Sequence, residues 1–169
     1  MSINQNRRFG GVARLYGEDG YDAFQAGHVL VAGLGGVGSW AAEALARSAV
    51  GELTLVDFDH IAPSNVNRQL HAIEGEFGKS KVQAMAERLR AINPELNIHV
   101  IDDFLTPDNI PMMLEQIQAR RFVVLDATDD VNMKITLAAY CGKKIPLVIC
   151  GAAGGKLDPT RIKIEDLAK

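Results

Sequence analysis

Short apolar runs alternate along the chain with segments whose apolar residues recur at helical spacing. Strands are predicted for five of the runs, at residues 28–33, 53–57, 98–101, 122–126 and 147–150. Helices are predicted between them, at residues 37–48, 79–92 and 130–141. Thr106 and Pro107 indicate one more helix start, with Thr106 as its cap and the proline at the first position.

The alternation of strands and helices decides the fold class. It predicts an α/β, Rossmann-like, doubly wound domain with a mainly parallel sheet and helices on both faces. We assign residues 28–155 to this domain and residues 1–27 to an N-terminal arm and helix. Residues 156–169 are expected to begin a C-terminal portion, with a short strand at residues 161–164.

The composition is that of an ordinary soluble protein. Of the 169 residues, 47% are hydrophobic, and the formal net charge of −3 does not indicate a polyanion partner. We find no secretory signal and no apolar run near the ~20 residues that cross a bilayer, so we expect a cytoplasmic protein away from membranes. Cys141 and Cys150 form no C-x-x-C pair and are expected to be buried thiols.

A glycine-rich loop follows the first predicted strand. Gly33, Gly35 and Gly38 fit the pattern G-x-G-x-x-G, between a strand and a helix as that pattern requires. Such a loop lets the backbone approach a phosphate, and the helix start offers free N–H groups. Asp57 ends the next strand, where an acid can bind ribose hydroxyls. These features predict a nucleotide site, and by themselves they suit NAD as well as ATP.

Cationic side chains after the second strand favour ATP. Arg68 lies in the loop sequence N-V-N-R-Q, and Lys81 lies at the start of the next helix. A triphosphate needs more cations than a dinucleotide pyrophosphate, although a solvated surface pair would look the same in sequence. Asp126 and Asp129 end the fourth strand, where an acid could hold Mg²⁺. Capping of the next helix by Asp129 or Asp130 is an equally good interpretation.

Five motifs together resemble the ubiquitin-activating-enzyme-like superfamily of adenylating enzymes, the ThiF and MoeB type. They are G-L-G-G-V-G-S, V-D-F-D, N-x-N-R-Q, G-K-S-K and A-T-D-D. Further strings from residue 7 onward, such as R-R-F-G-G-V-A-R-L-Y-G and G-A-A-G-G-K-L-D-P-T, resemble the tRNA threonylcarbamoyladenosine dehydratases. The resemblance implies adenylation of the threonylcarbamoyl carboxylate by ATP, followed by cyclisation on the tRNA.

The resemblance also implies roles for single residues. Asp57 would bind the ribose, and Asp129 would be the Mg²⁺ ligand. Lys81 aligns with the family lysine, which makes Lys79 the weaker candidate. The residues implied to contact the phosphates are Gly33, Gly35, Gly36, Gly38, Asn65, Arg68 and Lys81.

The resemblance leaves several points open. Family members are usually homodimers. In the carrier-protein activators an N-terminal arginine often reaches the partner's ATP, and here Arg7, Arg8 and Arg14 are all candidates. It does not settle whether residues 151–155 hold a monovalent cation, or whether a sulfur-transfer protein is a partner. The dehydratases continue beyond Lys169, so this chain is expected to be the nucleotide-binding portion of a longer protein, with full activity of the 169 residues alone in doubt.

Two other function classes compete with the tRNA-modifying enzyme. The first is an enzyme that adenylates the C-terminus of a ubiquitin-like sulfur-carrier protein. The missing zinc cysteines and the dehydratase-like strings argue against it. The second is a non-catalytic scaffold or an NAD-binding domain, which a preference for NAD over ATP would reveal.

Overall fold

A five-stranded parallel sheet forms the centre of the molecule. The computed structural model describes residues 3–115, 117, 121–142 and 144–166. The strands are β1 (Gly27–Ala32), β2 (Glu52–Val56), β3 (Asn97–Ile101), β4 (Arg121–Asp126) and β5 (Leu147–Ile149). They lie in the order β3-β2-β1-β4-β5, and all four pairings are parallel. All five predicted strands are therefore confirmed.

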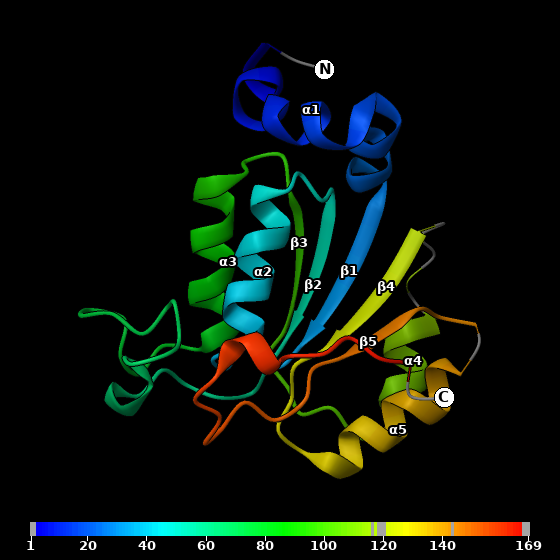
Figure 1. Cartoon of the computed structure of the whole chain (residues 1–169). Coiled ribbons are helices and arrows are strands. Elements are labelled where there is room, and N and C mark those ends of the chain that lie inside the picture. The colour runs from blue at the N-terminus through cyan, green and yellow to red at the C-terminus, as the bar shows by residue number, and fades with distance from the viewer. Residues whose placement is uncertain (1–2, 116, 118–120, 143, 167–169) are drawn as a thin grey trace.

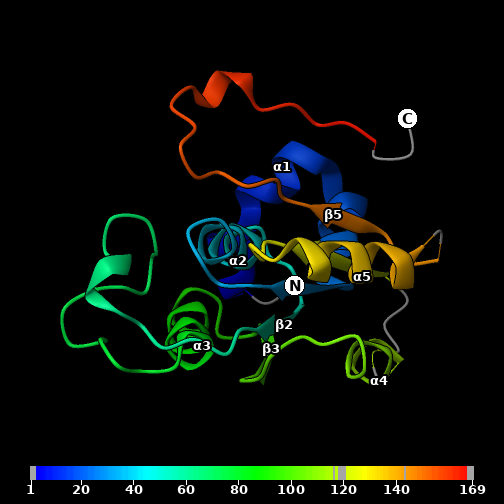
Figure 2. The ribbon, with the colours of Figure 1, turned by 90° about the horizontal axis from the view of Figure 1, so that it is seen from below.

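Helices cover both faces of the sheet (Figures 1 and 2). On one face, α2 (Gly38–Arg47) and α3 (Lys81–Ile92) bury an apolar cluster that includes Val31, Leu53 and Leu55. On the other, α4 (Ile110–Glu115) and α5 (Val131–Cys141) pack on the opposite side chains of the same strands, such as Leu30 and Val124. Buried residues on both faces explain the almost continuous apolar runs, and they confirm the doubly wound fold.

The helix starts follow local capping, with small shifts from the prediction. Thr106 accepts from the Asn109 N–H at 3.2 Å, and Asn109 returns a bond to the Thr106 N–H at 2.8 Å, so Thr106 caps a turn and α4 begins at Ile110. The helix predicted from residue 79 begins at Lys81, because the Lys79 N–H bonds to the Glu76 carbonyl in a turn. None of the described helices is long and apolar enough to span a membrane.

The N-terminal helix lies across the amino ends of the strands (Figure 1). This helix, α1 (Ile3–Gln25), is interrupted at Gly17, whose φ of 75° only glycine adopts readily. Phe9 and Tyr21 pack with Ala49 in a small apolar cluster. Arg8 donates to the Ile92 carbonyl at 3.0 Å, which ties α1 to the end of α3.

The C-terminal segment contradicts one prediction. The strand expected at residues 161–164 is absent, and Arg161 instead ends a short 3-10 helix, η2 (Pro159–Arg161). Asp158 caps this turn by accepting from the Thr160 N–H at 3.0 Å and from its hydroxyl at 2.6 Å. A proline at the first position favours the same turn, so local chemistry outweighs the β-branched residues that suggested a strand.

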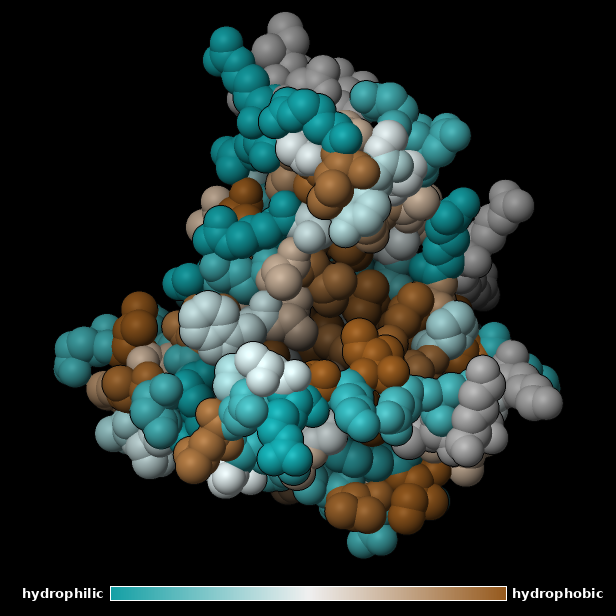
Figure 3. Space-filling model, viewed as in Figure 1, coloured by the Kyte–Doolittle hydropathy of each residue, from teal (hydrophilic) through white to brown (hydrophobic). Residues whose placement is uncertain are grey.

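One part of the sheet has little helical cover in the described part of the chain. Beside α2, Figure 3 shows apolar side chains gathered in a hollow over the sheet. Val148 on β5 is half exposed, and the segment that follows β5 is exposed as well.

Candidate nucleotide-binding site

The glycine-rich turn between β1 and α2 is shaped by close backbone contacts. Gly33 has a φ of 83° and donates to the Val56 carbonyl at 2.8 Å. A side chain on Gly33 would lie 3.0 Å from the backbone of Ala127 and Thr128, and one on Gly38 would collide with the Gly33 carbonyl oxygen. Gly33 and Gly38 are therefore required by the fold of the turn itself.

The other two glycines of the turn face different surroundings. A side chain on Gly35 would meet nothing within 4 Å, so the backbone is open to a ligand at this point. A side chain on Gly36 would press on the aliphatic stem of Arg68, at 3.1 Å from Cγ and 3.2 Å from Cδ. The structure thus brings the stem of Arg68 next to the glycine turn, 32 residues away in the chain.

Asp57 connects the end of β2 to the same turn. Its Oδ2 accepts from the Leu34 N–H at 2.6 Å, and its Oδ1 accepts from the Asp59 N–H at 2.9 Å. The residue as a whole is 9% exposed. Asp57 therefore fixes the start of the glycine turn, and its two oxygens keep lone pairs that a hydroxyl could donate to.

The two predicted phosphate-binding cations differ in their surroundings. Arg68 is exposed, and its Nη1 donates to the Ser64 carbonyl at 3.1 Å and to Asn67 Oδ1 at 2.8 Å. Lys81 is buried, with its Nζ 2.6 Å from Asp59 Oδ2. Asp59 is a partner that sequence reasoning missed, although it belongs to the V-D-F-D motif. Since an ammonium has three donors, Lys81 keeps capacity for a second acceptor.

Asn65 has a local role in the loop that carries Arg68. It ends the 3-10 helix η1 (Pro63–Asn65), and its Oδ1 accepts from the Ala62 N–H at 2.9 Å. Its backbone carbonyl accepts from the N–H groups of Arg68 and Gln69. Asn65 therefore shapes the turn on which Arg68 lies.

The three acidic residues at the end of β4 and just after it have different surroundings. Asp130 is the cap of α5, accepting from the Asn132 N–H at 2.7 Å. Asp126 is fully buried, where Thr128 donates to Oδ1 and Lys134 lies 3.3 Å from Oδ2. Asp129 is exposed, and its carboxylate bonds to none of the residues that the structure describes. Of these acids, Asp129 is the one left free for a ligand.

The surroundings of Asp129 suit a weakly held ion. The described residues include no group of three or more histidine, cysteine or acidic side chains that could hold a metal by themselves. Mg²⁺ commonly uses one or two protein carboxylates, with water and substrate phosphates as its other ligands. A single free carboxylate beside the glycine turn fits that type of site.

Other candidates from the sequence lie outside the site. Lys79 pairs with Glu76 at 2.8 Å on an exposed turn. Arg7, Arg8 and Arg14 belong to α1, which lies at the amino ends of the strands, whereas the glycine turn lies at their carboxyl ends (Figure 1). Both cysteines are free; Cys141 is fully buried and Cys150 half-buried, and burial raises the pKa of both thiols.

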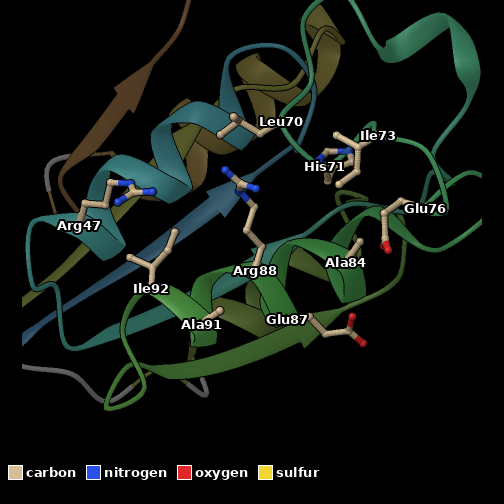
Figure 4. A pocket seen from close by; sticks show the side chains of 10 residues that line it. All are labelled: Arg47, Leu70, His71, Ile73, Glu76, Ala84, Glu87, Arg88, Ala91 and Ile92. Carbon is tan, nitrogen blue, oxygen red and sulfur yellow. The ribbon is translucent and has the colours of Figure 1, made fainter.

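A separate pocket of about 440 Å³ lies outside this site, against α2, α3 and residues 70–76 (Figure 4). His71 is buried there, and neither ring nitrogen has a partner among the described residues. Burial, followed by the charges of Lys81 and Arg88, lowers the pKa of His71 to about 4. The histidine therefore stays neutral at physiological pH.

Four neighbours of the site escaped the sequence analysis. Trp40 donates its indole N–H to the Arg68 carbonyl at 3.0 Å. Lys134 neutralises Asp126, and the exposed rings of Phe58 and Phe104 stack with centroids 3.5 Å apart beside the ends of β2 and β3. Only Trp40 had a usable signal, since it stands two residues after the last glycine of the motif.

Comparison with known proteins identifies the family of the chain. The pattern of the ThiF family matches residues 9–166. The chain belongs to the ThiF family. It is 51% identical to the tRNA threonylcarbamoyladenosine dehydratase of Escherichia coli K12, over 96% of this chain and 60% of that protein. It is 37% identical to the molybdopterin-synthase adenylyltransferase of Salmonella typhimurium LT2, over 89% of this chain and 58% of that protein.

A solved structure has the same fold. The crystal structure of the E. coli tRNA N6-threonylcarbamoyladenosine dehydratase in complex with ATP superposes with a TM-score of 0.94 at 50% identity, covering 99% of this chain and 68% of that one. This chain spans about 60% of the length of the curated dehydratases it matches.

Proposed function

We propose that this chain is the ATP-binding portion of a tRNA threonylcarbamoyladenosine dehydratase. The observation that carries the proposal is the contact of Arg68 with Gly36, which joins a phosphate-type glycine turn to a cation in a chain 51% identical to such an enzyme. Gly33, Gly35, Gly36 and Gly38 line the phosphates, and Asp57 accepts from the ribose hydroxyls. Asn65 supports the loop that presents Arg68.

The reaction has two steps. A carboxylate oxygen of the threonylcarbamoyl group attacks the ATP α-phosphorus, and pyrophosphate leaves. A nitrogen of the same side chain then attacks the acyl carbon and gives up its proton to solvent, which closes the ring and releases AMP. The hydroxyl oxygen formally lost as water thus leaves on AMP.

The residues of this chain act on the first step through charge. Arg68 presents a planar set of N–H donors to phosphate oxygens, and Lys81 adds a second cation from inside the fold. Asp59 holds Lys81 from one side, at 2.6 Å, so the ammonium is oriented before ATP binds. Mg²⁺ on Asp129 would supply further positive charge to the phosphates.

Nucleotide preference tests the proposal most directly. Calorimetry on the 169-residue chain with Mg²⁺ is expected to give tighter binding for ATP than for NAD. The reason is that a triphosphate carries more negative charge than the pyrophosphate of NAD, and Arg68 and Lys81 would bind that charge. Tighter binding of NAD than of ATP contradicts the proposal and returns the chain to the NAD-binding class.

Adenylation of a sulfur-carrier protein is the second candidate function. It is favoured by the 37% identity to a molybdopterin-synthase adenylyltransferase. ATP–pyrophosphate exchange by the longer protein separates the two. Stimulation by tRNA that bears threonylcarbamoyladenosine supports the dehydratase, and stimulation by a carrier protein with a Gly-Gly tail supports the alternative.

A homodimer in the cytoplasm completes the proposed assembly. Because α1 lies at the amino ends of the strands, far from the glycine turn of its own subunit, an arginine of α1 would contact the ATP of the partner subunit. Arg8 already donates to the Ile92 carbonyl, which leaves Arg7 and Arg14 as candidates. Light scattering gives the oligomeric state. Mixing an Arg14→Ala variant with an Arg68→Ala variant should restore activity in mixed dimers if Arg14 acts across the interface.

Two smaller elements of the proposal concern ligands other than ATP. A monovalent cation would be held by backbone carbonyls of residues 151–155, which form an exposed glycine-rich loop. Comparing turnover in potassium, sodium and tetramethylammonium salts tests it. A sulfur-transfer protein as a partner is tested by co-purification with the longer protein.

A further inference from the structure

The first turn of α2 holds the segment that carries Arg68. Trp40 Nε1 donates to the Arg68 carbonyl at 3.0 Å, and Ser39 Oγ accepts from the Leu70 N–H at 3.4 Å. Both bonds join a rigid helix to residues about 30 positions later in the chain. The Arg68 segment is therefore attached to the same helix whose N-terminus follows the glycine turn.

Gly36 packs against the aliphatic stem of Arg68. The stem of Arg68 lies so close that a side chain at this position would sit 3.1–3.3 Å from its Cβ, Cγ and Cδ atoms. The missing side chain thus makes room for the stem of Arg68. The indole N–H thus fixes the backbone of Arg68, and the surface of Gly36 fixes the position of its aliphatic stem.

This attachment matters because the other hydrogen bonds around Arg68 lie mostly within its own loop. Between β2 and α3, the one regular element is η1, and residues 63–68 are exposed except for a half-buried Asn65. A long exposed side chain on such a loop would lose much conformational entropy on binding a ligand. Donors that are fixed before the reaction avoid that cost and act most strongly on charge in the transition state.

We propose that Trp40 is a positioning residue that holds Arg68 over the glycine turn for the phosphates of a nucleoside triphosphate. This inference rests on the proposed function, because it needs Arg68 to contact those phosphates. Trp40 is 57% exposed, so its ring contributes only part of its surface to packing, while its N–H reaches the carbonyl of Arg68.

The test is a double-mutant cycle on the 169-residue chain, with the Kd for ATP and Mg²⁺ measured by calorimetry. Trp40→Phe keeps an aromatic ring and removes the N–H. It is expected to raise the Kd about fivefold, the factor for one lost hydrogen bond of ordinary strength. In the Arg68→Ala background, Trp40→Phe is expected to leave the Kd unchanged, since Trp40 acts through Arg68.

A control variant separates positioning from general loosening of α2. Ala44 is exposed one turn after Trp40, and Ala44→Gly weakens the helix without contacting Arg68. It is expected to lower the melting temperature and leave the Kd for ATP unchanged. If Ala44→Gly weakens ATP binding as much as Trp40→Phe does, the specific role of Trp40 is refuted.

The remaining outcomes distinguish this inference from the proposed function. Equal effects of Trp40→Phe in both backgrounds, or no effect in the wild type while Arg68→Ala weakens binding, overturn the role of Trp40 alone. An unchanged Kd in Arg68→Ala removes Arg68 from the phosphates, and the proposed function loses its main support. Fivefold weakening confined to the background with Arg68 supports both.

Discussion

At the scale of single residues, the two cations proposed to bind phosphate lie in opposite environments. Arg68 is exposed on a loop, whereas Lys81 is 4% exposed and paired with Asp59. A change at Arg68 should therefore leave no cavity. A change at Lys81 leaves Asp59 unpaired, but the Asp59 side chain is 48% exposed and water can replace the partner. Truncation of Lys81 also removes a buried side chain, so its effect on activity is compared with its effect on thermal melting.

Arg68→Ala in the longer protein is expected to slow adenylation about 10²–10³-fold, which is typical for losing one fixed donor. Lys81→Ala should lose a similar factor because it acts on the same phosphates. The double variant is expected to lose less than the product of the two factors, since groups that act together are not additive. Single-turnover cyclisation on tRNA bearing the threonylcarbamoyl group measures all three, with thermal melting as the fold control.

Asp57 and Asp129 are expected to fail in different ways. Asp57→Ala removes the acceptor for the Leu34 N–H, so nucleotide binding should weaken whether or not Mg²⁺ is present. Asp129→Asn should keep nucleotide affinity without metal and shift the Mg²⁺ requirement of turnover to higher concentration. Mg²⁺ titrations of turnover compare the variants, and a curve for Asp129→Asn that overlays the wild type excludes the metal role.

At the scale of elements, different glycines of the β1–α2 turn are expected to serve the fold and the binding of ATP. Gly38→Ala places a methyl group against the Gly33 carbonyl, so β1 and α2 must move apart. We expect a loss of about 2–3 kcal/mol in the free energy of unfolding, the upper part of the range for overpacking. Gly35→Ala is the matched control, because a methyl group there meets open space and should weaken ATP binding without changing stability. Urea titration and ATP calorimetry on both variants give the comparison.

The junction between β4 and α5 depends on a buried ion pair. Lys134→Met leaves the fully buried Asp126 with only the two donors of Thr128. We expect a loss of about 3 kcal/mol, near the lower limit for breaking a buried pair. Lys79→Met removes an exposed partner of Glu76 and should change the urea midpoint little. Similar midpoints for the two variants would contradict the structural role of Lys134.

At the scale of the whole molecule, one buried histidine makes stability depend on pH. The pKa of His71 is about 4 in the folded protein and near 6.5 when unfolded, so the unfolded chain binds more protons between these values. Stability is therefore expected to fall as the pH drops from 6.5 toward 4, by at most about 3 kcal/mol. Urea unfolding across this range should show a shallower slope for His71→Gln than for the wild type.

The His71→Gln comparison isolates one group among several. Burial also lowers the pKa of His28, which contributes with the same sign, and that contribution is present in both proteins. Only the difference between the two slopes belongs to His71. Identical slopes would mean that His71 titrates normally in the folded chain.

Much of the fold followed from the sequence, because its signals are local. Apolar runs gave the five strands, glycine spacing gave the turn before α2, and Thr106 marked the start of the α4 region. The prediction of a strand at residues 161–164 is wrong because two local signals compete there. β-branched residues suggest a strand, but the cap of Asp158 favours a turn.

The sequence by itself determined the α/β class, the position of the glycine turn and the residues to consider for phosphate binding. Only the tertiary structure decided which acid caps α5 and which stays free. It also decided that the Arg68 stem lies against Gly36 while the Arg68 carbonyl accepts from the indole N–H of Trp40. Capping and turn chemistry involve neighbours in the chain and leave a pattern in sequence. Contacts between residues some 30 positions apart leave none, because they form only when β1, α2 and the loop after β2 have packed together.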